Sequence, residues 1–440
     1  MSTIFSMFRK NTTMVVSIFS GTLLVFFVGM LFGHFKLPPQ PTLALTIHAI
    51  KDLTEHGKSY YFEKPTRHMS NSRFKKTGIV VADIERAQPG VTFLVGLFGN
   101  TLSARLYALD GTLLHEWPVD FFKLDTEVMK YKFDALIHGA VLYPNGDFVA
   151  NFDGHGMVRV SACGKILWRN HDRTHHSIFI DDDGYIWAPK TRQDLYTEKS
   201  IFHQPFKFDQ IGRFDPETGK MIMEIDLVQV VIDSSAQDLV QGSNIRPFDM
   251  MHLNDVETLS KSMADNFPLF EAGDIMLSSR HFNQIWILDS KSHKIKWWQT
   301  GPMFGQHDPD FQADGTITLL DNRPIGVPRK ENGFLGDAGG SRILSINPQT
   351  RTFKNQYISN ERNVFFTPYR GKHQVLANGN ILIAETDAGR AFEILPNGEI
   401  VWSFVNAWDE DEVGWILGAQ RYPDTFVSIG NIKCSSKNPH

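Results

Sequence analysis

Histidines recur at one position of a repeated sequence unit in this chain. Each stands directly before an apolar stretch that alternates like a β-strand and is followed by a turn and a second such stretch. The five residues are His138, His176, His252, His307 and His373. A neutral imidazole binds zinc or copper, exchanges protons near neutral pH, and can accept a transferable group on a ring nitrogen. The histidines therefore predict metal binding, acid–base catalysis or nucleophilic catalysis.

Arginines follow the second strand of several of these units. A nucleophilic mechanism acting on an anionic group needs a cation to hold that group. By itself, each arginine is typical of a surface salt bridge. Arg280 is well placed for the catalytic role because it lies at the end of a predicted inner strand. The three residues are Arg280 in SSRH (278–281), Arg323 in DNRP (321–324) and Arg192 in PKTR (189–192).

The elements that carry these residues repeat along the chain. One unit consists of a strand, a turn with Asp, Asn or Gly, and a strand that ends in an aromatic residue. Its six copies span 104–117, 157–168, 211–225, 284–298, 342–357 and 391–404. A period of about 50 residues built from four short strands is typical of propeller blades. The sequence therefore predicts an all-β fold, a six-bladed β-propeller.

The ends of the repeat array predict how the ring closes. Blade one lacks a first strand of its own, whereas 417–433 resembles the strands that follow His138, with Gln420 in place of histidine. We expect this C-terminal segment to pair with blade one, because closure removes exposed sheet edges. One longer interval between repeats is explained by a helix-like segment, 227–239, and an insertion near 258–269.

Ring geometry gives the histidines a shared location. The innermost strand of each blade begins near one mouth of the central channel, so residues far apart in sequence converge there. A lone histidine before a strand is typical of a turn or cap, and histidines that only bind one another or water are a further alternative. Five in one register favour a functional site.

Composition narrows the functional classes. The chain has 440 residues, with 44 Lys and Arg against 49 Asp and Glu, a formal net charge of −5, and 42% hydrophobic residues. These values exclude a disordered chain and a polytopic membrane protein, and the absence of a basic excess argues against a nucleic-acid partner. Cys163 and Cys434 are too few for a disulfide scaffold, and their spacing does not show whether they pair.

The N-terminus has the composition of a membrane anchor. Residues 11–35 contain no Asp, Glu, Lys or Arg, and this uncharged stretch is long enough for a transmembrane helix. Arg9 and Lys10 predict a cytoplasmic N-terminus, and no small-residue cleavage site follows. We expect the propeller on the periplasmic side of the inner membrane of a Gram-negative cell. The predicted parts are 1–36, cytoplasmic N-terminus and transmembrane anchor; 37–90, linker or arm with a short helix; and 91–440, propeller.

Several segments resemble the arylsulfotransferase family, the bacterial aryl-sulfate sulfotransferases and their propeller relatives. The resemblance covers about residue 91 to the C-terminus. It is most specific over 249–322, where H-x-N, SSRH, and Q-H followed by DN occur in order at blade spacing. The matching segments are DMMHLNDVE (249–257), GDIMLSSRHFNQIWILDSKSHKIKWW (273–298), GQHDPDFQADGTITLLDN (305–322) and HQVLANGNILIAETDAGRAFEILPNGEIVWSF (373–404).

This resemblance implies sulfuryl transfer from a phenolic sulfate ester to a phenol, through a transiently sulfated histidine and without a cofactor or metal. It implies that His307 is the nucleophile, that His252 is a second catalytic histidine and that Arg280 binds sulfate. His176 matches a further family histidine, although the sequence leaves open which member of the His175–His176 pair faces the channel. We expect the substrate-binding residues to include Arg323, His373 and His138.

The chain departs from the family at the nucleophile. Asp308 follows His307 where well-characterised family enzymes carry a small hydroxyl residue. A carboxylate there would repel the sulfate unless it faces away, or it could orient the imidazole as in a catalytic triad. The paired cysteines near the channel and the immunoglobulin-like domain of some members are also not found.

Two other functions compete with sulfuryl transfer. An anchored propeller with an arm and a helical insertion could be a non-catalytic scaffold subunit that binds partner proteins in a membrane-associated complex, because fold does not fix function. A metal- or quinone-dependent oxidoreductase is the third hypothesis. Copurification of a stoichiometric partner would favour the scaffold, and metal analysis with an absorption spectrum would test the oxidoreductase.

Overall fold

A computed structural model describes most of the chain, in two compact units, Met1–Thr66 and Arg67–His440. In the first unit a helix covers 19–34. No helix among the described residues is long and apolar enough to cross a membrane, so the predicted transmembrane helix is not supported. Much of the expected short helix before residue 57 lies outside these residues. The described residues are 19–34, 46, 47, 50, 53, 54, 57, 63–124, 133–192, 194–196, 206–241, 249–325, 338–427, 432 and 434.

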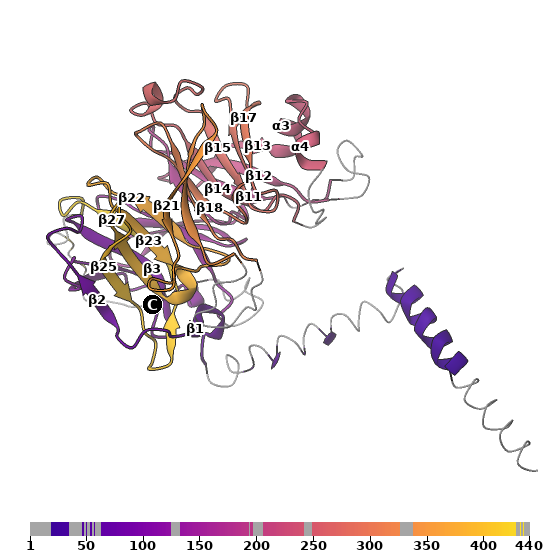
Figure 1. Ribbon diagram of the computed structural model, residues 1–440, viewed down its shortest axis with the longest axis horizontal. Coiled ribbons are helices and arrows are strands. Elements are labelled where there is room, and N and C mark those ends of the chain that lie inside the picture. Colours follow the sequence, from indigo (N-terminus) through magenta and orange to yellow (C-terminus); the bar gives the residue numbers. More distant parts are fainter. Residues whose placement is uncertain are drawn as a thin grey trace, which may run out of the picture. The chain divides into compact units, whose positions relative to one another are not determined.

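Six antiparallel sheets make up the propeller of the second unit, as the repeats predict (Figure 1). The first three blades contain β27 (Ile416–Tyr422), β3 (Val91–Phe98), β4 (Thr101–Tyr107) and β5 (Leu113–Glu116); β6 (Ile137–Leu142), β7 (Phe148–Phe152), β8 (Gly156–Val160) and β9 (Ile166–Asn170); and β10 (Phe179–Ile180), β11 (Ile186–Thr191), β12 (Asp209–Phe214) and β13 (Met221–Asp226). The last three contain β14 (Leu253–Thr258), β15 (Ile275–Ser279), β16 (Gln284–Leu288) and β17 (Ile295–Thr300); β18 (His307–Phe311), β19 (Ile317–Asp321), β20 (Arg342–Asn347) and β21 (Thr352–Ile358); and β22 (Lys372–Val375), β23 (Ile381–Glu385), β24 (Arg390–Ile394), β25 (Ile400–Val405) and β2 (Gly78–Ala82).

The ring closes as predicted, with the C-terminal strand β27 beside β3 of blade one. The two strands are antiparallel, and Ala419 lies opposite Leu94. Strands from opposite ends of the propeller thus share one sheet, which leaves no open blade edge at the closure.

Segments outside the regular blades add to this frame. From the predicted arm, β2 extends the last blade through β25, and β1 (Met69–Asn71) pairs with β26 (Glu412–Gly414). The predicted helical segment is present as α3 (Leu227–Asp233), capped by Asp226 Oδ1 on the Val228 amide at 3.0 Å, and α4 (Asp238–Gln241). Short 3₁₀ helices are η1 (Thr66–His68), η2 (Phe121–Lys123), η3 (Ala264–Asn266) and η4 (Thr386–Ala388).

Tryptophans in or directly after the fourth strand of a blade join neighbouring blades. Each indole nitrogen donates to a main-chain carbonyl in a turn of the next blade, and the last one reaches back to blade one. The pairs are Trp117 to Gly146 at 2.9 Å, Trp168 to Pro216 at 2.9 Å, Trp297 to Pro348 at 3.1 Å and Trp402 to Leu109 at 2.8 Å. A buried indole must satisfy its N–H, which explains the aromatic residue that ends the sequence repeat.

Candidate active site

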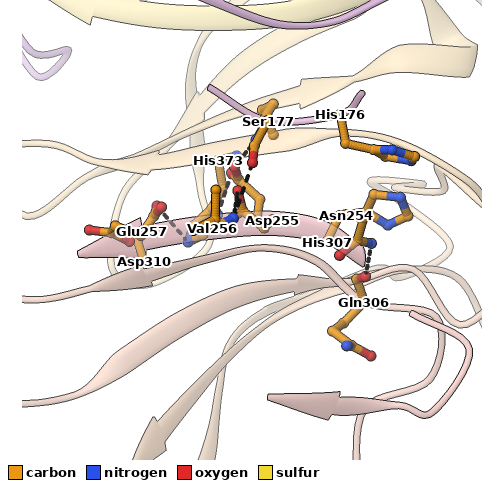
Figure 2. A network of polar contacts seen from close by, with 12 residues as sticks. His176, Ser177, Asn254, Asp255, Val256, Glu257, Gln306, His307, Asp310 and His373 are labelled. Carbon is orange, nitrogen blue, oxygen red and sulfur yellow. Dashed lines mark hydrogen bonds and ion pairs between the residues drawn. The ribbon is translucent and has the colours of Figure 1, made fainter. Parts of the chain in front are cut away.

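Four of the five repeated histidines meet near the central channel. His176 lies among the others, with its ring centroid 4.4 Å from that of His138, 4.9 Å from that of His252 and 6.2 Å from that of His307. His138 and His307 lie on β6 and β18, whereas His176 and His252 precede β10 and β14. The predicted convergence of these residues is therefore present, and Figure 2 shows His176 beside His307.

The local backbone aims these side chains. His176, His252 and Asp308 have φ values of +57°, +49° and +56°, a left-handed conformation that is unfavourable for residues with a Cβ atom. Such conformations concentrate at functional sites, where the surrounding structure maintains them. Gly139 allows β6 to lie against the His176 segment, because a Cβ there would be 2.6 Å from the His176 carbonyl oxygen.

His307 has the environment of a neutral nucleophile. Its Nδ1 lies 2.7 Å from Asn322 Oδ1 and 3.1 Å from the Gly305 carbonyl oxygen. Its Nε2 is buried and has no hydrogen-bond partner among the described residues. Burial, followed by the positive charge of Arg280, lowers the pKa of His307 well below its usual 6.5. At pH 7 the ring is therefore uncharged and keeps a lone pair on one nitrogen.

Arg280 joins His252 and His307 in one site. It directly follows β15, and its main-chain N–H donates to the His252 carbonyl at 3.1 Å. A Cβ built on Gly305, two residues before His307, would lie 4.0 Å from Arg280 Nε. The guanidinium carbon also lies 5.6 Å from the centroid of the Tyr369 ring. The arrangement sets a cation beside the neutral imidazole.

A carboxylate fixes the orientation of His252. Asp249 Oδ2 lies 2.7 Å from His252 Nδ1, and the Asp249 carbonyl oxygen accepts a bond from His281 Nδ1 at 2.8 Å. Burial, the largest single influence, would raise the pKa of Asp249, but the bond to His252 and the charges of the neighbouring histidines together lower it. An ionised Asp249 holds the Nδ1 proton of His252, which leaves Nε2 able to accept or donate a proton.

The two histidines of the His175–His176 pair differ in their partners and in the direction of their pKa shifts. The two Nδ1 atoms lie 2.9 Å apart, and His175 Nε2 forms an ion pair with Asp209 Oδ1 at 3.6 Å. Burial, the largest single influence, opposes protonation of His175, but Asp209 and two further carboxylates, Asp153 and Asp249, together raise the His175 pKa. Burial and the neighbouring histidines lower that of His176. The raised pKa of His175 and the lowered pKa of His176 favour His175 as the donor of the bond between the two Nδ1 atoms, which leaves the His176 proton on Nε2.

His138 is also held in one protonation state. Arg370 Nε donates to His138 Nε2 at 3.1 Å, so the neutral ring carries its proton on Nδ1. Burial and the charge of Arg370 lower the pKa of His138 well below 6.5. His138 belongs to the histidine cluster and also lines a cavity in the central channel.

His373 lies in the channel with Asp308. The Asp308 carboxylate accepts bonds from Lys372 Nζ and from the His373 main-chain N–H, and it lies 3.1 Å from His373 Nδ1. His373 Nε2 lies 2.8 Å from Thr318 Oγ1. Asp308 thus faces Lys372 and His373 and not the His307 ring. The alternative in which Asp308 orients the His307 imidazole is wrong, because Asn322 occupies that position.

The two other arginines singled out in the sequence make structural contacts. Arg323 Nη1 donates to the Gly340 carbonyl at 3.3 Å. Arg192 Nη1 pairs with Asp226 Oδ2 at 2.6 Å, and its guanidinium carbon lies 4.2 Å from the Tyr196 ring centroid. Neither contact involves the histidine cluster.

Carboxylates line a cavity of about 210 Å³ in the central channel, and His138 and His373 also line it. Asp255 and Glu257 of β14 and Asp308 and Asp310 of β18 all line this cavity. Burial raises the pKa of Asp255 to about 6 and raises those of Glu257 and Asp310. Figure 2 shows Glu257 and Asp310 away from His176 and His307.

Three groups in the described part of the chain have ligand atoms close enough to hold a metal ion, within 4.8 Å of one another in each group. They are His138–Asp153–His176, Asp249–His252–His281 and Asp308–Asp310–His373. In the first group, the bond from Arg370 to His138 Nε2 places a proton on the Nδ1 that would have to bind the ion. The third group already holds the Lys372 ammonium.

Sequence reasoning missed several residues of the site. Asp249 begins the quoted segment DMMHLNDVE and His281 ends SSRH, but neither was given a role, and Asn322 is the second residue of the DN pair. The signal for Asp249 was its position three residues before His252, within hydrogen-bond reach of that side chain. Nothing local in the sequence indicated that Asn322 contacts His307, because the two residues lie on different strands.

Comparisons with solved structures find matches at low sequence identity. A protein of unknown function from Bacteroides caccae is 12% identical, with 76% of this chain and 98% of that chain covered and a TM-score of 0.48. A catalytically inactive virginiamycin B lyase from Staphylococcus aureus, solved with quinupristin, is 13% identical, with 61% and 70% covered and a TM-score of 0.36. The Dos1 propeller is 8% identical, with 78% and 76% covered and a TM-score of 0.39.

Comparison at the level of sequence families is more informative. No curated protein matches the chain. A family model described as arylsulfotransferase (ASST) matches residues 139–407, more than half of the chain and every blade from the second onward. That range contains Arg280 and three of the four converging histidines, His176, His252 and His307. His138 directly precedes it. The resemblance seen in the sequence is thereby confirmed, and the chain belongs to the arylsulfotransferase (ASST) family.

Proposed function

We propose that this protein transfers a sulfuryl group from a phenolic sulfate ester to a phenolic acceptor through a sulfohistidine on His307. The observation that carries the proposal is the pairing of a neutral, buried His307 with the nearby Arg280 cation. The Nε2 atom is the ring nitrogen left for the sulfur, because Nδ1 lies against Asn322 and Gly305. The family of the chain supports the same reaction class.

In the first half-reaction, the His307 Nε2 lone pair forms an N–S bond while the bond from sulfur to the aryl oxygen breaks. The electron pair of that bond leaves with the phenolate, which takes a proton from His252. Arg280 neutralises the non-bridging sulfuryl oxygens. His176, with its proton on Nε2, is placed to donate a further hydrogen bond to these oxygens.

In the second half-reaction, the acceptor phenol loses its proton to His252 and its oxygen attacks the sulfur. The S–N bond breaks, and its electron pair returns to Nε2 of His307. Asp249 stabilises the His252 imidazolium that donates the first proton and that the second half-reaction regenerates; between the two half-reactions His252 is neutral. Positioned acid–base groups typically contribute roughly 10²–10⁴-fold in rate. The kinetics should be ping-pong, because the aryl product leaves before the acceptor reacts.

Mass analysis of the protein after incubation with 4-nitrophenyl sulfate tests the proposal. We expect the His307 peptide to gain one sulfuryl group, and we expect His307→Ala to lose both this modification and the release of 4-nitrophenol. Turnover without a modified His307 would refute the covalent mechanism, and an absence of turnover on every aryl sulfate would refute the reaction class.

We also propose that the reaction takes place in the periplasm. The pairing of Cys163 with Cys434, whose Cα atoms are 5.3 Å apart, supports an oxidising compartment, because disulfides persist there and are rare in the cytosol. Alkylation of the protein in intact and lysed cells, followed by non-reducing electrophoresis, tests this location. Two thiols that are free and alkylated in vivo would contradict it.

A further inference from the structure

We propose that Asn322 is a positioning residue that fixes the tautomer of His307, with the proton on Nδ1 and the lone pair on Nε2. This inference rests on the proposed function and adds a reason for an amide, rather than a carboxylate, at this place. Asn322 directly follows β19 and is fully buried.

The other contacts of Asn322 decide which end of its amide faces the imidazole. Asn322 Nδ2 donates to the Thr367 carbonyl at 2.6 Å and to the Arg370 carbonyl at 2.5 Å. Both donors are thus used, and Oδ1 is the atom that lies 2.7 Å from His307 Nδ1. A flipped amide would set Oδ1 against two carbonyl oxygens, which cannot donate. His307 Nδ1 must therefore carry the hydrogen.

The main chain around Asn322 is held in place by a second set of bonds. The Ser341 hydroxyl donates to the Asn322 carbonyl oxygen at 3.0 Å, and its oxygen accepts from the Thr367 amide at 3.1 Å. The Gly305 carbonyl, 3.1 Å from His307 Nδ1, accepts from the same hydrogen. Side chain and main chain together leave Nε2 as the nitrogen that can attack.

An amide suits a nucleophilic histidine better than a carboxylate does. In a catalytic triad the carboxylate stabilises an imidazolium, which assists a general base. A nucleophile must stay neutral in the resting enzyme, and a negative charge at this distance would raise its pKa. A neutral acceptor also leaves the Nδ1 proton on the sulfated ring. The ring then departs as a neutral imidazole in the second half-reaction.

The conservative variant Asn322→Asp tests this role. The carboxylate should move the acid limb of the pH profile of kcat/KM upward by roughly 1–3 units. It should also draw the Nδ1 proton away from the sulfated ring, so that the second half-reaction slows and the fraction of His307 found sulfated at steady state rises. Asn322→Ala should lose about tenfold or more in kcat/KM, because the two tautomers then compete.

Nitrogen NMR of the full chain labelled with ¹⁵N-histidine measures the tautomer without any turnover, with His307→Gln used to assign the signal. We expect protonated Nδ1 and unprotonated Nε2 in the wild type, and a loss of this fixed pattern in Asn322→Ala. Asn406→Ala is the matched control: Asn406 is buried, and its Nδ2 donates to the Leu97 and Gly414 carbonyls at 2.7 and 2.9 Å. It should leave the signal and the pH profile unchanged.

The outcomes separate this inference from the proposed function. A wild-type His307 protonated on Nε2, or an Asn322→Asp protein with an unchanged pH profile, would overturn the role of Asn322 even if sulfuryl transfer proceeds. Conversely, the fixed tautomer would be found in a protein that transfers no sulfuryl group if only the reaction class is wrong. If Asn322→Ala fails to fold, the wild-type signal and Asn322→Asp still decide the question.

Discussion

Replacing Arg280 by alanine removes the cation that we place on the transferred sulfuryl group. A hydrogen bond to a charged group contributes about 1.5–3 kcal/mol, and a guanidinium can offer two such bonds to one anion. Their loss from the transition state therefore costs about 3–6 kcal/mol, which is roughly 10²–10⁴-fold in kcat/KM. Release of 4-nitrophenol from 4-nitrophenyl sulfate measures it directly.

The same replacement should change the pH profile. Arg280 is the largest influence after burial that lowers the pKa of His307. Its removal raises that pKa toward 6.5, and because the nucleophile must be neutral, the acid limb of kcat/KM moves to higher pH. Arg280→Lys keeps the charge but loses the two-pronged geometry, so it should keep the wild-type acid limb while kcat falls.

Arg192 provides the matched control. It holds the corresponding position in its own blade, but its guanidinium pairs with Asp226. Arg192→Ala should change kcat/KM by less than about threefold, since it removes a partly exposed ion pair. The reasoning would be refuted if Arg280→Ala lost less than tenfold, or if it and Arg192→Ala behaved alike.

Three further predictions concern stability and are checked by urea unfolding monitored by tryptophan fluorescence. Burial lowers the pKa of His68 from 6.5 to about 3, so the unfolded chain binds this proton first and stability falls as pH drops below 6.5. Between pH 6.5 and 4.5, His68→Phe should lose about 2 kcal/mol less than the wild type, and equal losses would exclude His68 as a cause. Reduction of Cys163–Cys434, which closes a long loop, should lower the free energy of unfolding by about 2–4 kcal/mol, with Cys434→Ser as a reduction-insensitive control. Trp402→Phe loses the bond to the Leu109 carbonyl and should cost about 1–3 kcal/mol; no change would mean that this bond between the last and first blades is unimportant.

The blades were predictable because their signals are local. Strand alternation, turn residues and the terminal aromatic of each repeat occur together within about 15 residues. The spacing of the repeats indicates propeller blades, and the number of copies gives the number of blades. Closure by β27 was also predictable, because blade one lacks a strand and the C-terminus supplies one. The transmembrane prediction, by contrast, rested on apolar composition alone, and no helix among the described residues is long and apolar enough to cross a membrane.

The sequence by itself also determined which histidines begin the inner strands, because register within a blade is a local property. It could not determine their directions. Left-handed backbone at His176, His252 and Asp308 turns each side chain away from where an ordinary strand would aim it. The His176 ring therefore lies near the His307 ring, whereas His175 pairs with Asp209, and the Asp308 side chain points toward Lys372.

The protonation state of His307, by contrast, depends on groups that only the folded chain brings together. The protonation of His307 depends on burial by several blades, on the charge of Arg280 from blade four, and on Asn322, whose own orientation is set by carbonyls of Thr367 and Arg370. These groups are separated by up to about 90 residues along the chain. Hydrogen bonds and Coulomb interactions act over a few ångströms of space, so no spacing in the sequence could reveal them.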